Sequence, residues 1–296
     1  MNSPSGRPTK WRESIDCGCK VNLRLKVTAR RPDKLHDLSS CFVFLPHPGD
    51  RLTVESRPGS ALTLEVPGHP ELAGEKNLLW IAAERYAEKC GITPDWLLIL
   101  EKNVPVAAGL GGGSADAGAL LALLNRHYAL LNDDELKTLA FSLGADVPFF
   151  LERRTAWVTG AGENLEFLET GIPLPEILIV NPGFPVSAKW AFTHMAPELI
   201  SGDDPAEKAA FTAGRADWKS FCCNDLAPAV FHKFPLLGIL RDELLACGAA
   251  AVQMSGSGSS LFAVFPNGGA ASAAEMMKKE FCDLKSLRIF TGGKEF

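Results

Sequence analysis

The stretch that decides the fold is Pro105-Val106-Ala107-Ala108-Gly109-Leu110-Gly111-Gly112-Gly113-Ser114-Ala115. It leads directly into residues 115–125, a run rich in alanine and leucine whose composition predicts a helix buried on most sides. Backbone N–H groups at the N-terminus of a helix can converge on an anion, and glycines allow close approach because no side chain shields the backbone. The stretch therefore predicts a phosphate-binding loop at the start of a helix.

Two common phosphate-binding patterns do not fit this loop. It is neither G-x-x-x-x-G-K-[ST] nor a G-x-G-x-x-G turn after a dinucleotide-binding strand, so neither pattern is favoured. A flexible glycine linker is the alternative interpretation. The loop lacks polar spacer residues and a helix starts at once, which favours a rigid site. In such a site the Ser114 hydroxyl can hydrogen-bond phosphate or bind Mg²⁺.

The chain before this loop is a run of predicted strands, which argues against a doubly wound sheet. Over residues 20–28, apolar and polar residues alternate at the two-residue period of a half-buried strand. Further strands are predicted at residues 41–45, 50–56, 62–66 and 96–100. Helices are predicted at residues 78–89 and 133–143, with Asp134 contributing to the N-terminal cap of the second helix.

A second mixture of strands and helices follows Gly162. Strands are predicted at residues 177–180, 250–254 and 261–265, and helices at 235–247 and 270–281. A cluster of glycine and proline at residues 171–175 predicts a domain boundary. We therefore expect two domains, at residues 14–172 and 173–296.

The composition is that of an ordinary globular protein with room for a sizeable core. The 296 residues carry a formal net charge of −5, which predicts no strong attraction to nucleic acid or to anionic lipid. No apolar run approaches the ~20 residues of a membrane span, and residues 1–10, an expected disordered leader, lack the apolar segment of a secretion signal. The eight cysteines show no C-x-x-C spacing. We expect a cytoplasmic protein with reduced, mostly buried thiols and no metal-binding cluster.

Three motifs in a fixed order carry a family resemblance. Besides the glycine-rich loop, these are Lys20-Val21-Asn22-Leu23 and Met254-Ser255-Gly256-Ser257-Gly258-Ser259. Together they resemble the three motifs of the GHMP kinases and cover nearly the whole chain. The resemblance implies an α+β fold, with an N-terminal domain like domain 2 of ribosomal protein S5 and a C-terminal ferredoxin-like domain. It also implies that ATP and an acceptor bind in the cleft between the domains.

The resemblance implies which residues bind ATP. Asn77 would meet the adenine, and the phosphates would lie on the glycine-rich loop, steadied by a second turn in the third motif. A plain β-turn is the alternative for that second turn. The implied ATP-binding residues are Asn77, Lys102, Pro105, Gly109, Leu110, Gly111, Gly112, Gly113, Ser114, Ala115, Gly256 and Ser257. Mg²⁺ would accompany ATP, with few protein ligands.

One further segment indicates a branch of the family. Gly144-Ala145-Asp146-Val147-Pro148-Phe149-Phe150 resembles the catalytic segment of the diphosphocytidyl-methylerythritol kinases, as do Arg30-Arg31-Pro32-Asp33 with His36 and the pair Asn224-Asp225. Phosphoryl transfer requires an in-line acceptor hydroxyl and neutralisation of developing charge. A carboxylate can accept the hydroxyl proton, and an ammonium group can stabilise that carboxylate and the forming alkoxide.

Asp146 and Lys20 suit these two catalytic roles. Taken singly, Asp146 is more simply a turn carboxylate and Lys20 a solvated residue at the start of a strand. Their joint placement in two family motifs favours catalysis instead. Asn22 is two positions after Lys20 and so faces the same side of the strand, where it can help to orient the acceptor.

The implied substrate pocket contains both matches and departures. In the family a histidine, here His36, hydrogen-bonds a cytosine ring and an aromatic residue, here Phe192, stacks on it; a surface histidine and a core aromatic are the alternatives. The family's usual tyrosine on the opposite face is replaced by Leu35, and its usual threonine after Ser187 by Ala188. Losing one stacking face would weaken substrate binding by roughly 1–3 kcal/mol. The residues for phosphoryl transfer are unaffected by this loss, so the departures concern the identity of the substrate rather than kinase activity.

The expected reaction is transfer of the ATP γ-phosphate to the 2-hydroxyl of a cytidylyl methylerythritol in the non-mevalonate route to isoprenoid precursors. One alternative is a GHMP kinase acting on a different alcohol. The other is a non-catalytic nucleotide-binding sensor, against which Lys20 and Asp146 argue. The expected partners are ATP and a small-molecule alcohol, without nucleic acid or membrane, in a monomer or weak homodimer.

Overall fold

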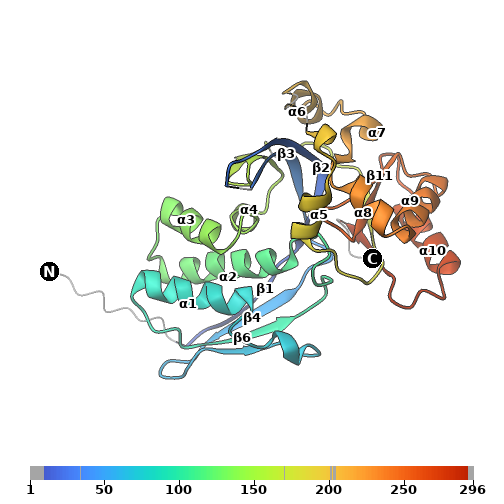
Figure 1. The fold of residues 1–296 in the computed structure, drawn as a ribbon. Helices are drawn as coiled ribbons and strands as arrows, with labels where there is room; N and C mark the ends of the chain where they lie inside the picture. Colours follow the sequence, from blue (N-terminus) through green and yellow to red (C-terminus); the bar gives the residue numbers. More distant parts are fainter. Residues whose placement is uncertain (1–9, 34, 170, 201, 203–204, 293–296) are drawn as a thin grey trace. The chain divides into compact units, whose positions relative to one another are not determined.

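The structure of the protein is a computed structural model that describes residues 10–33, 35–169, 171–200, 202 and 205–292. The described chain forms two compact units, each built from separate stretches (Figure 1). Unit 1 contains residues 10–17, 49–103 and 113–152, and unit 2 contains the described parts of 18–48, 104–112 and 153–292. The two domains expected along the sequence, 14–172 and 173–296, remain a prediction. The expected leader lies, apart from Lys10, outside the described residues.

Unit 1 is a four-stranded sheet with helices on one side of it (Figure 1). The strand order is β1 (Arg12–Asp16), β4 (Arg51–Ser56), β6 (Trp96–Glu101) and β5 (Thr63–Glu65). The first three strands pair antiparallel, and β5 runs parallel to β6. The helical segments are η1 (Pro70–Leu72), α1 (Leu78–Cys90), α2 (Gly112–Tyr128), α3 (Asp133–Leu143) and α4 (Phe149–Glu152).

Local capping explains where the helices of unit 1 begin. Asn77 caps α1, because its side chain accepts a hydrogen bond from the Leu79 N–H. Helix α3 begins with a capping box in which Asn132 and Glu135 satisfy each other's backbone N–H groups. The expectation that Asp134 contributes to this cap was wrong, since Asp134 lies inside the first turn and Asn132 supplies the cap.

Unit 2 contains two sheets. The five-stranded sheet has the order β10 (Cys223–Asn224), β2 (Cys19–Arg30), β3 (His36–Leu45), β7 (Ala156–Gly160) and β8 (Asn164–Phe167). The four-stranded sheet has the order β11 (Ala251–Met254), β12 (Leu261–Phe265), β9 (Glu176–Asn181) and β13 (Arg288–Gly292). The helical segments are α5 (Ala188–His194), η2 (Pro197–Leu199), α6 (Pro205–Thr212), α7 (Trp218–Phe221), α8 (Ala227–Lys233), α9 (Leu236–Ala246) and α10 (Ala270–Glu280).

Strand β2 is the element that brings polar side chains into unit 2. Its apolar residues Val21 and Leu23 enter a core with β3 and the four-stranded sheet. Its polar residues Lys20, Asn22 and Arg24 are nevertheless at most 4% exposed. The pairing of β2 with β3 shifts between Asn22 and Arg24, which marks a β-bulge at this point. Buried polar groups require partners, and the site described below supplies them.

The expected helices and strands are present, most of them with small shifts at their ends, but β3 begins at His36, five residues before the start of the strand expected at residues 41–45. Helix α2 begins three residues earlier than expected, because Gly112, Gly113 and Ser114 join it. The chain's eight cysteines are all free thiols, four of them buried. Among the described residues, no helix is both long and apolar enough to cross a membrane.

Candidate active site

The three sequence motifs meet within unit 2 through direct hydrogen bonds. The Lys20 N–H donates to the Leu110 carbonyl at 2.9 Å, which joins the first motif to the glycine-rich loop. The Ser255 hydroxyl donates to the Gly109 carbonyl at 2.9 Å and accepts from the Asn22 N–H at 3.3 Å. Residues more than 200 positions apart in sequence thus hold one loop.

Close backbone contact between the loop and the third motif requires glycine. A Cβ on Gly109 would lie 2.1 Å from the Ser255 carbonyl oxygen and 3.0 Å from the Gly258 nitrogen. Gly109 and Gly111 also have φ values of 79° and 71°, in the left-handed region that L-residues with a side chain avoid. A Cβ on Gly256 would lie 3.1 Å from the Gly109 carbonyl oxygen. The loop is therefore a packed structure rather than a flexible linker.

Lys20 and Asn22 lie together on β2. The Lys20 ammonium donates to Asn22 Oδ1 at 2.6 Å and lies 4.6 Å from the centroid of the Phe42 ring. Both side chains are almost fully buried, with 4% and 2% of their surface exposed. A buried ammonium held by an amide oxygen and an aromatic face keeps a fixed position. Such a group can stabilise negative charge that develops in a reaction.

Asn224 supports the third motif through side-chain hydrogen bonds to its backbone. Its side-chain NH2 group donates to the carbonyls of Met254 and Gly256, at 2.7 Å and 2.8 Å, and its Oδ1 accepts from the Leu226 N–H at 2.9 Å. The side chain is 4% exposed. The Asn224-Asp225 pair noted in the sequence thus contributes a structural amide that shapes the turn beginning at Gly256.

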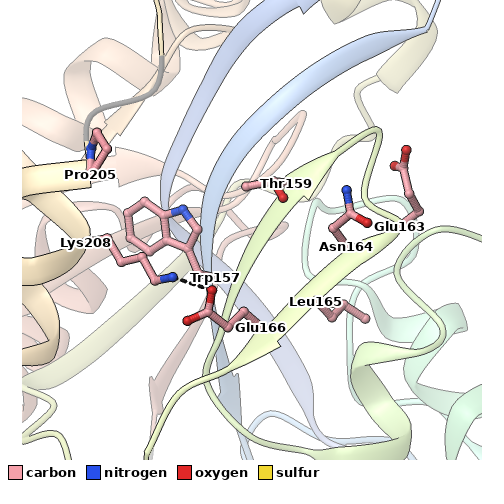
Figure 2. Close-up of a pocket in the computed structure, with 8 residues that line it drawn as sticks. All are labelled: Trp157, Thr159, Glu163, Asn164, Leu165, Glu166, Pro205 and Lys208. Carbon is pink, nitrogen blue, oxygen red and sulfur yellow. Dashed lines mark hydrogen bonds and ion pairs between the residues drawn. The ribbon is translucent and has the colours of Figure 1, made fainter.

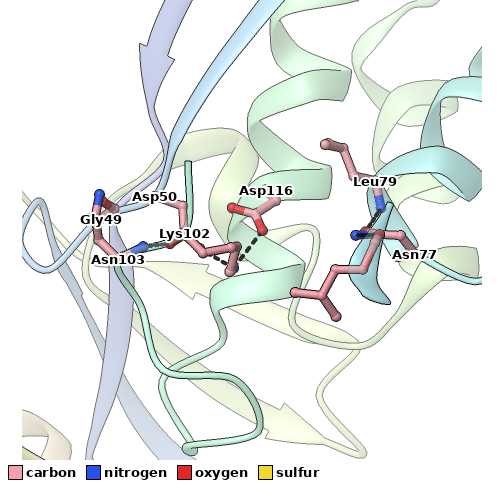
Figure 3. A network of polar contacts seen from close by, with 8 residues as sticks. Gly49, Asp50, Asn77, Leu79, Lys102, Asn103 and Asp116 are labelled. Carbon is pink, nitrogen blue, oxygen red and sulfur yellow. Dashed lines mark hydrogen bonds and ion pairs between the residues drawn. The ribbon is translucent and has the colours of Figure 1, made fainter. Parts of the chain in front are cut away.

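Lys102 belongs to a buried ion-pair network in unit 1 (Figure 3). Its ammonium contacts a carboxylate oxygen of Asp50 and lies 3.0 Å from Asp116 Oδ2. Asp50 also accepts from the Asn103 N–H at 2.6 Å. Burial lowers the pKa of Lys102, but the charges of Asp116 and Asp50 outweigh it, so the net shift is upward. The Lys102 ammonium is therefore engaged by two carboxylates.

Asp116 is the carboxyl group of this network whose pKa is shifted by its surroundings. Burial raises its pKa to about 7, the nearby Asp50 charge adds to the rise, and Lys102 opposes it. Its Oδ1 is buried and has no hydrogen-bond partner among the described residues. Burial and the second carboxylate next to the same ammonium thus shift the pKa of Asp116 upward.

The Asn77 side chain is also engaged within unit 1 (Figure 3). Its Oδ1 accepts from the Leu79 N–H at 2.9 Å, and its Nδ2 donates to the Leu72 carbonyl at 2.9 Å. One oxygen and one N–H of the amide are thus used in capping α1. The main chain of Asn77 is engaged as well, because its N–H donates to the Gly74 carbonyl at 2.9 Å and its carbonyl accepts from the Ile81 N–H at 3.1 Å.

Asp146 lies on the turn between α3 and α4 in unit 1, and it is half-buried. The Val147 N–H donates to the Gly144 carbonyl at 3.0 Å, which closes this turn. The turn packs tightly on α2, because a Cβ on Gly118 would lie 3.0 Å from the Val147 carbonyl oxygen and 2.7 Å from Phe150 Cβ. Glycine in the middle of α2 therefore positions the Asp146 turn.

The residues of the expected base pocket lie together in unit 2. The rings of His36 and Phe192 are stacked, with centroids 5.2 Å apart and an interplanar angle of 24°. Burial, and to a lesser extent the charge of Arg30, lowers the pKa of His36, which favours the neutral ring at neutral pH. Leu35 beside them is 52% exposed.

A pocket of about 600 Å³ lies elsewhere in unit 2, along β7 and β8 (Figure 2). Its charged groups are already paired: Lys208 contacts Glu166, and Glu163 lies 2.5 Å from Arg31. Its lining residues are Trp157, Thr159, Glu163, Asn164, Leu165, Glu166, Pro205 and Lys208. The residues expected to act in the reaction are not among them, and we assign this pocket no role.

Comparison with known proteins identifies the family. The model of the GHMP kinases N terminal domain matches residues 77–153, and that of the GHMP kinases C terminal domain matches residues 209–283. The chain belongs to the GHMP kinases. Together the two matches cover more than half of the described chain, and they include α1, α2, the glycine-rich loop and the Asp146 turn.

Individual GHMP kinases match over most of their length. A 4-diphosphocytidyl-2-C-methyl-D-erythritol kinase of Syntrophotalea carbinolica is 36% identical over 88% of this chain and 92% of its own. One of Anaeromyxobacter sp. (strain K) is 40% identical over 87% and 82%. A crystal structure of 4-(cytidine 5'-diphospho)-2C-methyl-D-erythritol kinase superposes with a TM-score of 0.78, at 34% identity, over 96% of this chain and 100% of that one.

More distant solved structures share the fold alone. A homoserine kinase from Cytophaga hutchinsonii superposes with a TM-score of 0.73 at 19% identity, over 99% of this chain and 97% of that one. The α+β fold of the GHMP kinases expected from the sequence is thereby confirmed.

Sequence reasoning missed several residues that hold the expected site residues within each unit. Ser40 on β3 is fully buried and bonded to Asn22, and Asp50 and Asp116 hold Lys102. Serine and aspartate within a strand and a helix give no distinctive local pattern. The one available signal was their polarity inside otherwise apolar elements, which predicts a buried partner without naming it.

Proposed function

We propose that this GHMP kinase transfers the γ-phosphate of ATP to the 2-hydroxyl of 4-diphosphocytidyl-2-C-methyl-D-erythritol, in non-mevalonate isoprenoid precursor biosynthesis. The observation that carries the proposal is the hydrogen-bonded junction of the three kinase motifs in unit 2. The names of relatives at 35–40% identity supply the acceptor. A cytoplasmic monomer or weak homodimer is the expected form.

The proposed ATP site is the backbone around the glycine-rich loop. N–H groups of the loop and of the first turn of α2 bind the phosphates, and the Gly256-Ser257 turn supports them. The Lys102 side chain is engaged by carboxylates, so Lys102 is proposed to contribute through its main chain, and Asn77 is proposed to contribute through the second N–H of its side-chain amide. The complete proposed set is Asn77, Lys102, Pro105, Gly109, Leu110, Gly111, Gly112, Gly113, Ser114, Ala115, Gly256 and Ser257.

Mg²⁺ is proposed to accompany ATP and to offset the charge of the phosphate oxygens. The Ser114 hydroxyl, half-buried at the start of α2, is a suitable oxygen ligand. Among the described residues there is no group of three or more His, Cys, Asp or Glu arranged for a metal ion. The donor set on the protein side therefore consists of hydroxyl and backbone groups.

The proposed chemistry uses three side chains. Asp146 accepts the proton of the acceptor hydroxyl as that oxygen attacks the γ-phosphorus. Lys20 stabilises the negative charge on the attacking oxygen and the phosphoryl group. Asn22 holds Lys20 in place through the 2.6 Å hydrogen bond and helps to orient the acceptor. The leaving group is ADP.

Base recognition is proposed at His36 and Phe192. The aromatic face of Phe192 offers stacking, and neutral His36 offers one ring N–H donor and one ring nitrogen acceptor to a cytosine edge. Leu35 offers an apolar but weaker surface where the family has an aromatic ring. The exposed Leu35 is also the observation that favours a second candidate, a GHMP kinase with another alcohol acceptor.

Radiolabelled ATP and a panel of alcohols test the proposal. The cytidylyl methylerythritol is expected to be labelled with the highest kcat/KM, and homoserine, mevalonate and galactose are expected to remain unlabelled.

Asp146→Asn is expected to lower kcat at least a hundredfold while the Kd for ATP changes little, because the amide keeps the shape but cannot accept the proton. Labelling of another alcohol only would replace the acceptor, and turnover within a few-fold of wild type would remove Asp146 from the base role.

A further inference from the structure

Ser40 lies beside the two catalytic-motif residues of β2 and is completely buried. Its hydroxyl is 2.5 Å from the Arg24 carbonyl oxygen and 3.1 Å from the Nδ2 of Asn22. On the other side of Asn22, Oδ1 is 2.6 Å from the Lys20 ammonium. These atoms form a chain of three hydrogen bonds, and all of them belong to unit 2.

The direction of every bond in this chain follows from the Arg24 carbonyl. A carbonyl can only accept, so the single hydroxyl proton of Ser40 must be donated to it. The hydroxyl oxygen is then left to accept, and its partner must be the NH2 group of Asn22. The Asn22 amide is thereby turned so that its oxygen faces Lys20.

The opposite orientation of the amide has no satisfied arrangement. A flipped Asn22 would place its NH2 group against the Lys20 ammonium, which has only donors. Its oxygen would meet the Ser40 hydroxyl, whose proton is already committed to Arg24. Buried donors and acceptors without partners are costly, so Ser40 selects one of two amide orientations.

We propose that Ser40 is a positioning residue for phosphoryl transfer, acting through Asn22 to aim the amide oxygen at Lys20. This inference rests on the proposed function, in which Lys20 stabilises the developing charge. The β-bulge between Asn22 and Arg24 contributes to this arrangement, because a bulge changes the direction of side chains and backbone groups along a strand. Without the hydroxyl, the Asn22 amide can flip, and its oxygen then no longer accepts from the Lys20 ammonium.

Kinetics of three single variants provide the first test of this assignment. Ser40→Ala is expected to lower kcat about three- to tenfold, the value of one hydrogen bond, with the KM for ATP unchanged. Ser40→Thr retains the hydroxyl and is expected to stay within threefold of wild type. Ser39→Ala is the matched control, because Ser39 is the equally buried neighbour on the other face of β3 and is expected to leave kcat unchanged.

The decisive comparison is made in an Asn22→Ala background. If Ser40 acts through Asn22, Ser40→Ala costs nothing further once Asn22 is gone, and the double variant equals the single one. Additive losses, a loss confined to the KM for ATP, or Ser40→Ala with wild-type kcat would overturn the proposal. If Ser40→Ala does not fold, Ser40→Cys, which keeps the volume but is a weak donor, takes its place.

A readout without substrate separates this proposal from the proposed function. The side-chain amide resonances of Asn22, assigned by their loss in Asn22→Ala, are expected to shift in Ser40→Ala and not in Ser39→Ala. Unshifted resonances overturn the orientation whatever the acceptor is. Shifted resonances together with an unlabelled cytidylyl substrate support the chain of hydrogen bonds and reject only the acceptor. Asn22→Ala with wild-type turnover rejects the role of both residues in the reaction.

Discussion

Asp116 shows at the residue scale how burial changes a charge. Its side chain is 2% exposed, its Oδ1 is unpartnered among the described residues, and its pKa is raised to about 7, chiefly by burial. A carboxyl group with a raised folded-state pKa contributes stability that is complete below its ordinary value near 3.8. That contribution is lost as the pH rises through the folded-state value.

Asp116→Asn is therefore expected to remove a pH dependence. Between pH 5 and 7 the wild-type free energy of unfolding should fall relative to the variant, by up to about 1 kcal/mol per pH unit. Denaturant unfolding at several pH values measures the difference. Asp217→Asn is the control, because hydrogen bonding to Ser220 lowers the pKa of Asp217 and keeps it ionised throughout this range. Parallel pH profiles for wild type and Asp116→Asn would contradict the argument.

Leu35 is the residue at which specificity is most open to change. It is exposed beside His36, where an added ring could stack on a bound base. Leu35→Tyr is expected to lower the KM for the cytidylyl substrate about tenfold and to change kcat little, since a remote base is held similarly in ground and transition states. Leu245→Tyr, at an exposed leucine of α9, is the control. A changed kcat with an unchanged KM would remove Leu35 from the base pocket.

Helix α2 carries several of the residues whose contacts are described above. Its N-terminal end follows the glycine-rich loop, its second turn carries Asp116, and Gly118 admits the Asp146 turn. The sequence of α2 thus reflects the close packing of the Asp146 turn on the helix as well as the helix propensity of its residues. A glycine inside a helix ordinarily costs about 1 kcal/mol relative to alanine, and here that cost is offset by the packing it allows.

Two glycine-to-alanine changes separate packing from propensity. Gly118→Ala is expected to destabilise the protein by about 1–3 kcal/mol and to lower kcat, because its Cβ would lie 2.7 Å from Phe150 Cβ. Gly238→Ala in α9, where nothing lies within 4 Å, is expected to stabilise it by about 0.5–1 kcal/mol. Thermal unfolding measures both. Shifts of the same sign would mean that α2 relaxes around the added methyl group.

Binding of a nucleotide is expected to raise the free energy of unfolding of the protein. A ligand that binds only the folded state stabilises it by about 2.7 kcal/mol at a hundredfold excess over its Kd. Mg²⁺-ATP is therefore expected to raise the Tm of the wild type by several degrees, and EDTA to reduce that rise. The size of the rise, rather than the Tm itself, reports on the site.

Gly109→Ala should abolish this rise in Tm. The added Cβ would lie 2.1 Å from the Ser255 carbonyl oxygen, so the loop and the third motif would have to separate. Comparing the Tm with and without Mg²⁺-ATP for each protein removes the variant's own effect on stability. A variant that keeps the wild-type rise would place the phosphates away from this loop.

The sequence by itself determined the family, the motifs and the longer elements. Helical periodicity over α1 and α3 is a strong local signal, because one face of each helix is buried. Alternation over β2 also predicted a strand, although its polar residues Lys20, Asn22 and Arg24 are buried as well. Strand β1, with its mostly charged and polar residues, and the two-residue β10 carry no such signal. Several polar side chains near the start of α3 could have capped it, and only the structure shows that Asn132 rather than Asp134 accepts the hydrogen bond from the helix end.

Only the tertiary structure decided how the motif residues are held. Asn22 meets Ser255 across 233 positions, and Lys102 meets Asp50 across 52. No local pattern encodes such partners, since a buried polar side chain states only that it needs a partner. The closing of the chain on itself supplies that partner. It also buries Asp116, which raises the pKa of that carboxyl group, and it sets which way the Asn22 amide is turned.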